Sequence, residues 1–390
     1  MGIKGLSKAV QDLAPSGIKT YALKNLFGRS VAIDASMCLY QFIIAIRKDG
    51  HFLTSPDGET TSHIAGFFYR TIRLMEAGIR PVYVFDGKPP TLKSYELDKR
   101  TERRDAAELR LKEATDAGDE EAIEKNQKML TRVTKEQNED CKKLLTFMGV
   151  PFVTAPCEAE AQCAELCKKG KVFATATEDM DALTFGTNIL LRHLMAPEAQ
   201  KVDITEFDMP KILKEIDFTM TEFIDFCILL GCDYTASIKN VGPKRAFELI
   251  KAHSSIENIL ENLEAKMIPP ENFLFKEARE LFLNPDVTDA EEIELKWNEV
   301  DIPGIINFLC SEKGFDEARI TKSLGRIKAA KSLGSQVRID QYFKVKSVVA
   351  TEKTQKKIKE EEDRINAKLK LKKGKIEKKP RTPAAKKCKK

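Results

Sequence analysis

The sequence predicts an α/β fold in which a central, mostly parallel sheet is flanked by helices. Short apolar segments typical of strands alternate along the chain with helical segments, an order that favours parallel strands covered on both faces. Acidic residues follow several of these strands, at the edge where ligands bind in such sheets. The chain has 390 residues, of which 42% are hydrophobic. That is enough for one large α/β domain with additions, or for two or three domains.

Five segments are predicted as strands because they are short, apolar and rich in β-branched residues. They span residues 30–35, 80–86, 150–154, 171–176 and 189–193. Helices are expected over residues 36–47 and 62–77, between the first two strands, and directly after the third strand. This order supports a parallel sheet.

Seven carboxylates fall where these strands end or where helices begin. They are Asp34, Asp86, Glu158, Glu160, Asp179, Asp181 and Asp233. Oxygen-only clusters suit hard divalent cations such as Mg²⁺ or Mn²⁺, and two such ions together cleave phosphodiesters. A single surface Asp is more often a helix cap or a solvated charge, but the set of seven indicates a metal-dependent nuclease site.

The two acidic pairs differ in how easily both members can face one site. Asp179 and Asp181 are two residues apart on extended chain and therefore share a face. Glu158 and Glu160 are two residues apart on a predicted helix, where their directions diverge by about 200°. Both glutamates can face the site only if the helix is just beginning at this pair.

Residues 91–143 form a distinct region, because 27 of these 53 residues are charged. Helix-forming residues predominate, and Gly118 is a plausible break between two helices that stand off the domain. Lys93 and Arg100 lie within about 20° on a helical wheel, so two cations share one face close in sequence to Asp86. A solvent-exposed hairpin with no role is the alternative.

A second motif occupies residues 221–252. A helix is predicted to end at Gly231, just before Asp233, and a tight turn then opens another helix with Pro near its first position. Exposed amides at that helix start, with Lys244 and Arg245 beside them, favour a grip on phosphate backbone that reads no base sequence.

Residues 255–330 read as further amphipathic helices that serve packing, with some DNA contact as an additional role. After them comes a segment with the spacing Q-x-x-[ILM]-x-x-[FY]-[FY]. Its fixed positions are Gln336, Ile339, Tyr342 and Phe343. Paired aromatics after an aliphatic residue on a helical turn form an apolar plug that fits a partner's pocket. A final turn that packs on the core is the alternative.

Charge is divided unevenly along the chain. Residues 344–390 hold 19 Lys and Arg against 6 Asp and Glu, a net charge of +13, which leaves −8 of the +5 total for residues 1–343. The tail is expected to be disordered and to seek polyanions, and its Lys-Lys-Pro-Arg motif resembles nuclear import signals. A merely solubilising tail is the alternative.

Several other classes of protein are disfavoured. The longest apolar runs are far shorter than the roughly 20 residues of a membrane span, and the N-terminus lacks the apolar region of a secretory signal. Leu6 stands where myristoylation requires Ser or Thr, so Gly2 is expected to carry a free amine. The nine cysteines form no C-x-x-C pair, which favours reduced thiols over a zinc site.

Taken together, these motifs resemble the eukaryotic flap endonucleases, in the superfamily of metal-dependent, structure-specific 5′ nucleases. The resemblance covers residues 1–345. Its carriers are MGIKGL at residues 1–6, VAIDAS at 31–36, VYVFDGKPP at 82–90, APCEAEA at 155–161, EDMD at 178–181 and LGCDY at 230–234. The resemblance implies a central mixed sheet, a helical arch above the active site and a helix–turn–helix element that holds duplex DNA.

The resemblance also implies a division of the chain. The expected parts are an N-terminal nuclease region (1–104), an arch connection (105–121), an internal nuclease region with the helix–turn–helix element (122–253), a C-terminal helical region (254–335), a sliding-clamp-binding motif (336–344) and a disordered basic tail (345–390).

By the same resemblance, all seven acids are ligands, direct or through water, of two Mg²⁺ ions, for which Mn²⁺ can substitute. Lys93 and Arg100 match catalytic cations at the base of the arch. Tyr40 matches a position that stacks on a nucleobase, although an ordinary half-buried tyrosine is the alternative. The expected DNA-binding residues are Gly2, Tyr40, Arg47, Arg70, Glu158, Gly231, Asp233, Lys244 and Arg245.

The implied function is removal of 5′ flaps at junctions of single- and double-stranded DNA, with additional 5′-3′ exonuclease activity. It belongs to lagging-strand (Okazaki fragment) maturation and long-patch base excision repair. The implied partners are branched DNA with a 5′ flap and the trimeric sliding clamp, proliferating cell nuclear antigen, bound through residues 336–344. A monomeric enzyme with no membrane partner is expected, in the nucleus (nucleoplasm and nucleolus), with mitochondria as a further location.

Three alternatives remain open. Another member of the superfamily, a junction resolvase or a mismatch-repair exonuclease, would share the acids. A Mg²⁺-dependent phosphatase of the aspartyl-phosphate type requires Asp-x-Asp at the first strand end, and residues 34–36 lack the second Asp. A clamp-bound DNA scaffold would have no use for seven acids that repel DNA.

Overall fold

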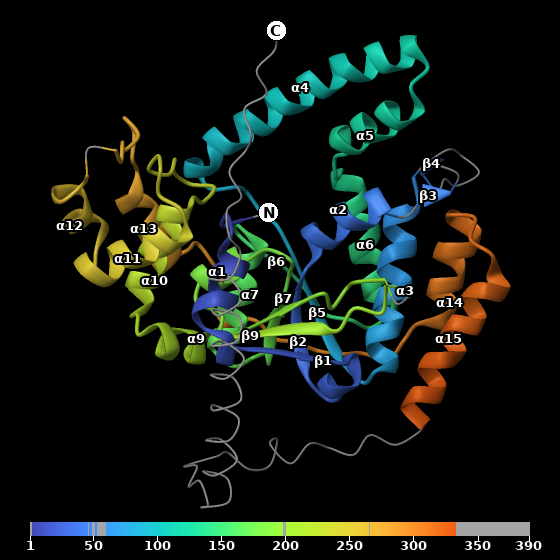
Figure 1. The fold of residues 1–390 in the computed structure, drawn as a ribbon. Coiled ribbons are helices and arrows are strands. Elements are labelled where there is room, and N and C mark those ends of the chain that lie inside the picture. The colour runs from blue at the N-terminus through green and yellow to red at the C-terminus, as the bar shows by residue number, and fades with distance from the viewer. Residues whose placement is uncertain are drawn as a thin grey trace, which may run out of the picture. The chain divides into compact units, whose positions relative to one another are not determined.

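The computed structural model describes residues 2–45, 47–48, 51–52, 60–197, 200–264 and 266–332 (Figure 1). The clamp-binding motif predicted at residues 336–344 and the tail predicted at 345–390 lie outside the described residues, as does the side chain of Arg47. Within the described part, no helix combines the length and apolar character needed to cross a membrane. All eight cysteines described there are free thiols.

A seven-stranded mixed sheet with the order β1-β9-β8-β7-β2-β5-β6 forms the centre of the fold. Its strands are β1 (Ile18–Tyr21), β2 (Ser30–Asp34), β5 (Arg80–Phe85), β6 (Phe152–Thr154), β7 (Ala174–Ala176), β8 (Ile189–Arg192) and β9 (Ile204–Asp208). A separate two-stranded ribbon joins β3 (Arg47–Lys48) to β4 (His51–Phe52).

The five strands predicted from the sequence are all present and run parallel. Strand β2 pairs with β5 on one side and β7 on the other, and β6 and β8 extend the block in the same direction. The predicted α/β class with a mostly parallel sheet is therefore confirmed. Two strands were not predicted: β9 is antiparallel to β8, and β1 is antiparallel to β9.

Fifteen α-helices are described around and above the sheet. They are α1 (Leu6–Leu13), α2 (Ala35–Ala45), α3 (Ser62–Glu76), α4 (Ser94–Ala117), α5 (Glu120–Leu130), α6 (Lys135–Phe147), α7 (Ala159–Lys168), α8 (Asp181–Thr184), α9 (Met209–Ile216), α10 (Met220–Leu230), α11 (Pro243–His253), α12 (Ile256–Glu261), α13 (Phe275–Leu283), α14 (Ile302–Ile306) and α15 (Glu317–Ser332).

Both faces of the sheet are buried, because successive side chains of a strand point to opposite sides. Val31 and Ile33 of β2 pack into a core with helices α2, α3 and α6. Ala32 lies between them in sequence and packs on the other face, with Val82, Val84 and helix α7. This two-sided burial explains why the central strands read as continuous apolar runs.

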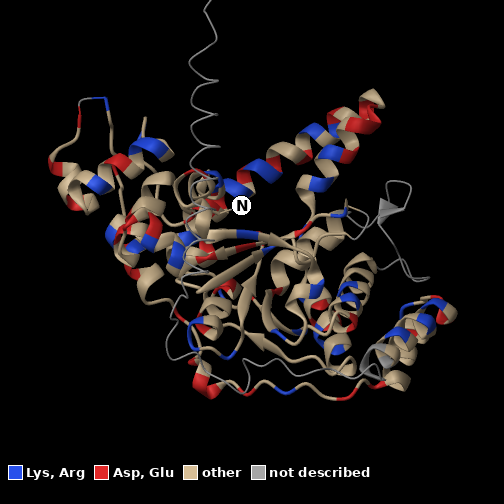
Figure 2. Ribbon diagram, turned by 60° about the horizontal axis from the view of Figure 1, so that its bottom comes forward, with Lys and Arg blue, Asp and Glu red and all other residues tan. Residues whose placement is uncertain are grey.

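Helices α4 and α5 form the polar helical pair predicted from the charged region, and they stand away from the sheet (Figure 1). Only Ala107 and Ala114 of α4 are buried. Gly118 ends α4 with a left-handed backbone, and the Asp119 side chain then caps α5 by accepting a hydrogen bond from the Ala122 amide. Basic and acidic residues alternate along this pair (Figure 2).

The prediction of helices throughout residues 255–330 is wrong for the segment between α13 and α14. That segment is an irregular strap with a single 3₁₀ turn. Ile293, Leu295 and Trp297 occupy alternate positions and cover the α7 side of the sheet, as an extended chain requires. Trp297 donates a hydrogen bond to the Pro81 carbonyl at 2.9 Å.

Candidate active site

Six of the seven predicted acids line one cavity of about 1010 Å³ at the edge of the sheet. They are Asp34, Asp86, Glu158, Glu160, Asp179 and Asp233, and Lys93 and Arg100 line the same cavity. Helices α4 and α5, called the arch below, stand over this edge (Figure 1). Asp34 ends β2, Asp86 follows β5 and Asp179 follows β7. Since β5, β2 and β7 are neighbouring parallel strands, their carboxyl ends deliver the three acids to one place.

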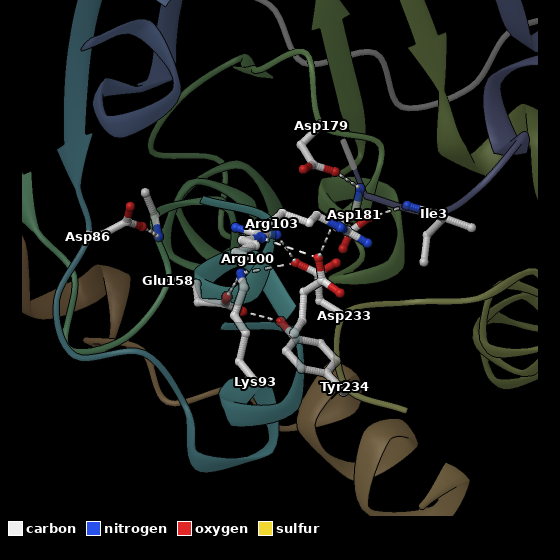
Figure 3. A network of polar contacts seen from close by, with 12 residues as sticks. Ile3, Asp86, Lys93, Arg100, Arg103, Glu158, Asp179, Asp181, Asp233 and Tyr234 are labelled. Carbon is white, nitrogen blue, oxygen red and sulfur yellow. Dashed lines mark hydrogen bonds and ion pairs between the residues drawn. The ribbon is translucent and has the colours of Figure 1, made fainter. Parts of the chain in front are cut away.

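The seventh acid, Asp181, lies beside the cavity. Its amide donates a hydrogen bond to Asp179 Oδ1 at 3.0 Å, and its own Oδ1 accepts one from the Ile3 amide at 2.7 Å (Figure 3). The N-terminal segment is thereby tied to the acid cluster. Gly2 has a φ of +74°, and a Cβ there would stand 1.8 Å from Asp179 Oδ1, so only glycine fits.

Helix α7 begins at the pair of glutamates, which is the condition under which both of them can face one site. Glu158 precedes α7 with an extended backbone (φ −94°, ψ 136°), while Glu160 lies in the first turn of that helix. The helix therefore begins between them, which lets both line the cavity. The Ala159 amide at the same helix start donates to Asp86 Oδ1 at 2.8 Å, and the helix dipole favours that carboxylate.

Burial and mutual repulsion raise the pKa of several of these acids. Burial, with the nearby charges of Asp86 and Asp179, raises the pKa of Asp34 to about 7. Burial, with neighbouring carboxylates, also raises the pKa values of Glu160 and Asp181 well above their ordinary range. A crowded, buried set of oxygen donors that repel one another fits hard divalent cations, which would supply the missing positive charge.

Among the described residues, no three acidic, histidine or cysteine side chains are already drawn together tightly enough to hold a metal ion. The physical reason is that uncompensated carboxylates repel, and two of them pair with cations of the arch. Lys93 contacts Glu158 and lies 3.5 Å from Asp233, while Arg100 Nη2 donates to Asp233 Oδ2 at 2.8 Å (Figure 3).

Lys93 remains charged in this environment. Burial alone would lower its pKa, but Glu158, Glu160 and Asp233 outweigh burial and raise it. Lys93 stands directly before α4, and Arg100 lies two turns into that helix. The structure thus brings the two predicted catalytic cations into direct contact with two of the predicted metal ligands, Glu158 and Asp233.

Several residues in or beside the cavity were not assigned a role from the sequence. Tyr234 is buried, and its hydroxyl donates a hydrogen bond to Glu158 Oε2. Further cations line the cavity, namely Lys4, Lys99, Arg103, Arg104 and Arg132. Arg103 and Arg104 could have been found from their spacing, since they lie three and four residues after Arg100 on the same helix. The contact between Tyr234 and Glu158 has no sequence signal, because it joins residues 76 positions apart.

The predicted DNA-binding residues divide into two groups. Gly2, Tyr40 and Gly231 line the cavity together with Glu158 and Asp233, whereas the side chains described for Arg70, Lys244 and Arg245 do not. Arg70 donates to the Ala196 carbonyl at 3.0 Å. Lys244 and Arg245 lie in the first turn of α11, whose N-terminal amides have no side-chain cap, as the predicted phosphate grip requires.

The fold and the site together define a metal-dependent nuclease. Models of the XPG N-terminal domain and the XPG I-region match residues 1–107 and 149–233. The chain is 56% identical over 373 residues to flap endonuclease 1 of Danio rerio, covering 95% of this chain and 97% of that protein. The structure of flap endonuclease-1 from Methanococcus jannaschii superposes with a TM-score of 0.65 at 34% identity, covering 85% of this chain and 99% of that one.

The catalytic core of Rad2 in complex with DNA substrate is also similar, with a TM-score of 0.65 at 28% identity over 82% of this chain and 99% of that one. The chain therefore belongs to the flap endonucleases, the divalent-metal-dependent enzymes that hydrolyse phosphodiester bonds of flap DNA in replication and repair.

Proposed function

We propose that this chain cuts 5′ flaps, and acts as a 5′-3′ exonuclease, with two Mg²⁺ ions held by its seven carboxylates. The observation that supports this most directly is the cavity shared by six of these acids with Lys93 and Arg100. All of the donors are oxygen atoms, which suits Mg²⁺ and allows Mn²⁺ to substitute. The charges of Asp34 and Asp86 act on Glu160, and those of Asp179 and Asp233 act on Asp181, so each of these two groups of acids would hold one ion.

The chemistry that bound Mg²⁺ supplies is activation of water and stabilisation of the leaving 3′ oxygen. The chain's own cations do the rest. Lys93 and Arg100 exchange their carboxylate partners for the scissile phosphate and neutralise the charge that builds on it. Because both stand at the base of the arch, a phosphate can meet them only at the mouth of the cavity.

The remaining residues hold DNA without reading its sequence. Tyr40 stacks on a nucleobase at the cavity, and Gly231, whose φ is +106°, lets the backbone approach closely. The uncapped start of α11, with Lys244 and Arg245, holds phosphates of the duplex. Arg47 and Arg70 hold further phosphates. Cleavage therefore depends on a junction and a free 5′ end rather than on base identity.

The C-terminal sequence supports a tether. Gln336, Ile339, Tyr342 and Phe343 fit the pocket of a trimeric sliding clamp, proliferating cell nuclear antigen, which raises the local concentration of a monomeric enzyme at primer junctions. The lysine-rich tail supports a nuclear location, in nucleoplasm and nucleolus, with mitochondria as a second location. These features suit Okazaki fragment maturation and long-patch base excision repair.

A single assay tests the proposal. The full chain is incubated with Mg²⁺ and double-flap DNA that carries a one-nucleotide 3′ flap. Incision near the junction is expected, and it should disappear with EDTA and with Asp181→Ala. Binding without incision would leave only the scaffold, and faster cutting of four-way junctions than of flaps would instead favour a junction resolvase. Titration with Mg²⁺ and Mn²⁺, with the bound ions counted, tests the ion identity and number.

A further inference from the structure

One aromatic side chain in the catalytic cavity has no part in the site described above. Tyr95 is the second residue of α4, and it is 59% exposed on a helix that is otherwise strongly polar. It lines the same cavity as Tyr40, Lys93 and Arg100. The exposed ring offers a planar apolar face at the wall of a charged cavity, where a ligand with an apolar face can pack against it.

The orientation of this ring is held by its own helix. The Lys99 ammonium, one turn further along α4, lies 3.9 Å from the centre of the Tyr95 ring. This cation–π contact occupies one face of the ring and limits its rotation. The residue remains 59% exposed even with this contact, so much of its surface is accessible to a planar partner.

The charges around Tyr95 indicate the class of that partner. Lys99, Arg103, Arg104 and Arg132 line the cavity with it, so a flat apolar ring is flanked by cations that suit phosphates. Aromatic rings alternating with cations are the usual means of holding single-stranded nucleic acid, because each base has a π-face and each backbone unit a negative charge. Inside a duplex the base faces are already stacked on one another, so unpaired nucleotides are the better partner for such a ring.

We infer that Tyr95 stacks on a nucleobase of the 5′ single strand where the strand passes the base of the arch. This inference deepens the proposed function and rests on it. Tyr95 is a substrate-positioning residue on α4, whereas Tyr40 lies on α2, the helix that follows Asp34. Lys99 then contacts the phosphate next to the stacked base.

The test uses the full chain and double-flap DNA, with Ca²⁺ in place of Mg²⁺ so that binding is measured without cleavage. Tyr95→Ala should weaken binding on the order of tenfold, the size of one lost base–aromatic stack. Tyr95→Trp should bind as the wild type does. The matched control is Leu109→Ala, which removes an equally exposed apolar side chain (61%) from the same helix outside the cavity and should leave affinity unchanged.

A second arm removes the bases instead of the ring. A flap whose unpaired nucleotides are abasic should weaken binding of the wild type by about tenfold more than it weakens binding of Tyr95→Ala, because the variant has already lost this one stack and any stack on Tyr40 is common to both proteins. If base removal weakens both proteins equally, or if Tyr95→Ala and Leu109→Ala behave alike, the inference is wrong. Wild-type incision of the same DNA with Mg²⁺ reports on the proposed function separately, since its absence would contradict that function whatever Tyr95 does.

Discussion

Gly2 shows how closely the residues of the site are fitted. Its left-handed backbone brings the N-terminus against the two carboxylates after β7, with no room for a side chain. Tyr234 donates a hydrogen bond through its hydroxyl to Glu158, a predicted metal ligand, and the centre of its ring lies 5.0 Å from that of Phe282. Each of these residues acts by holding an acid in position.

We expect Gly2→Ala to lower the rate of flap incision by at least 10²-fold, because the new methyl group displaces Asp179 or Asp181. Single-turnover incision measures this. The control is Gly170→Ala: Gly170 also has a left-handed backbone (φ +73°), but a Cβ there meets nothing within 4 Å. That variant should lose about 1 kcal/mol of stability and keep full activity. Equal activity of both variants would contradict the tight fit.

Tyr234→Phe should lower single-turnover incision on the order of tenfold while leaving DNA affinity intact, because only the hydrogen bond to Glu158 is lost. Tyr21→Phe is the matched control. It removes a comparable hydroxyl–carboxylate bond of 2.5 Å, to Glu206, at the edge of the sheet remote from the cavity. An equal loss of activity in both variants would show that the effect is general.

At the scale of elements, helices α10, α12 and α13 are held together by one ion network. Asp225 of α10 is fully buried and accepts two hydrogen bonds from Arg279 of α13, at 2.6 and 2.8 Å, while Arg279 also binds Glu257 of α12. The network sits next to α11 and its phosphate grip. The position of the start of α11 relative to Asp233, just after the end of α10, therefore depends on the buried ion pair between Asp225 and Arg279.

Arg279→Ala should lower the free energy of unfolding by about 3 kcal/mol, because it leaves Asp225 buried without its partner. Denaturant unfolding measures the change. Lys251→Ala, which breaks a pair with the exposed Asp217 (93% side-chain exposure), should cost at most about 1 kcal/mol. The prediction fails if the two variants unfold at the same denaturant concentration.

The elements found from the sequence are those that carry their own signal. Strand β2 is buried on both faces and reads as an apolar run closed by Asp34, and α4 ends at a glycine that its left-handed backbone needs. Strands β1 and β9 were not found because charged residues interrupt their apolar patterns, namely Lys19 in β1 and the buried Glu206 in β9. The strap after α13 was taken for helix because its period of two was not recognised.

The candidate site, too, was predictable only where the sequence carries a local signal. The acids could be placed because strand direction alone decides where residues after β2, β5 and β7 lie. The pairing of Lys93 with Glu158, and the contact of Tyr234 with the same acid, depend on how α4, α7 and the segment after α10 pack. No local pattern encodes such packing, so these contacts appeared only with the structure.

At the scale of the whole molecule, the acid cluster makes stability depend on pH. Burial raises the folded-state pKa of Asp34 to about 7 from an unfolded value of 3.8, so the folded protein binds this proton more tightly than the unfolded protein does. The metal-free protein should therefore lose stability as pH rises from about 4 to 7. Glu160 and Asp181, whose pKa values are also raised, change stability in the same direction.

In EDTA, the melting temperature should fall between pH 5.5 and pH 8, and Mg²⁺ should restore much of the loss at pH 8. Asp34→Asn, which removes one repelling charge, should melt higher than the wild type at pH 8 in EDTA and should have no incision activity. A melting temperature that rises with pH in EDTA would contradict this account of the cluster.

The ion pairs that Lys93 and Arg100 form with acids of the cavity have a consequence for when the enzyme is active. Lys93 and Arg100 serve as internal counter-ions to Glu158 and Asp233 in this structure. Both cations are therefore already paired with acids of the cavity before any phosphate reaches them. In the proposed function, activation would be an exchange of ion-pair partners in which phosphates of correctly placed DNA replace Glu158 and Asp233, and DNA that does not reach the cavity would leave these pairs intact.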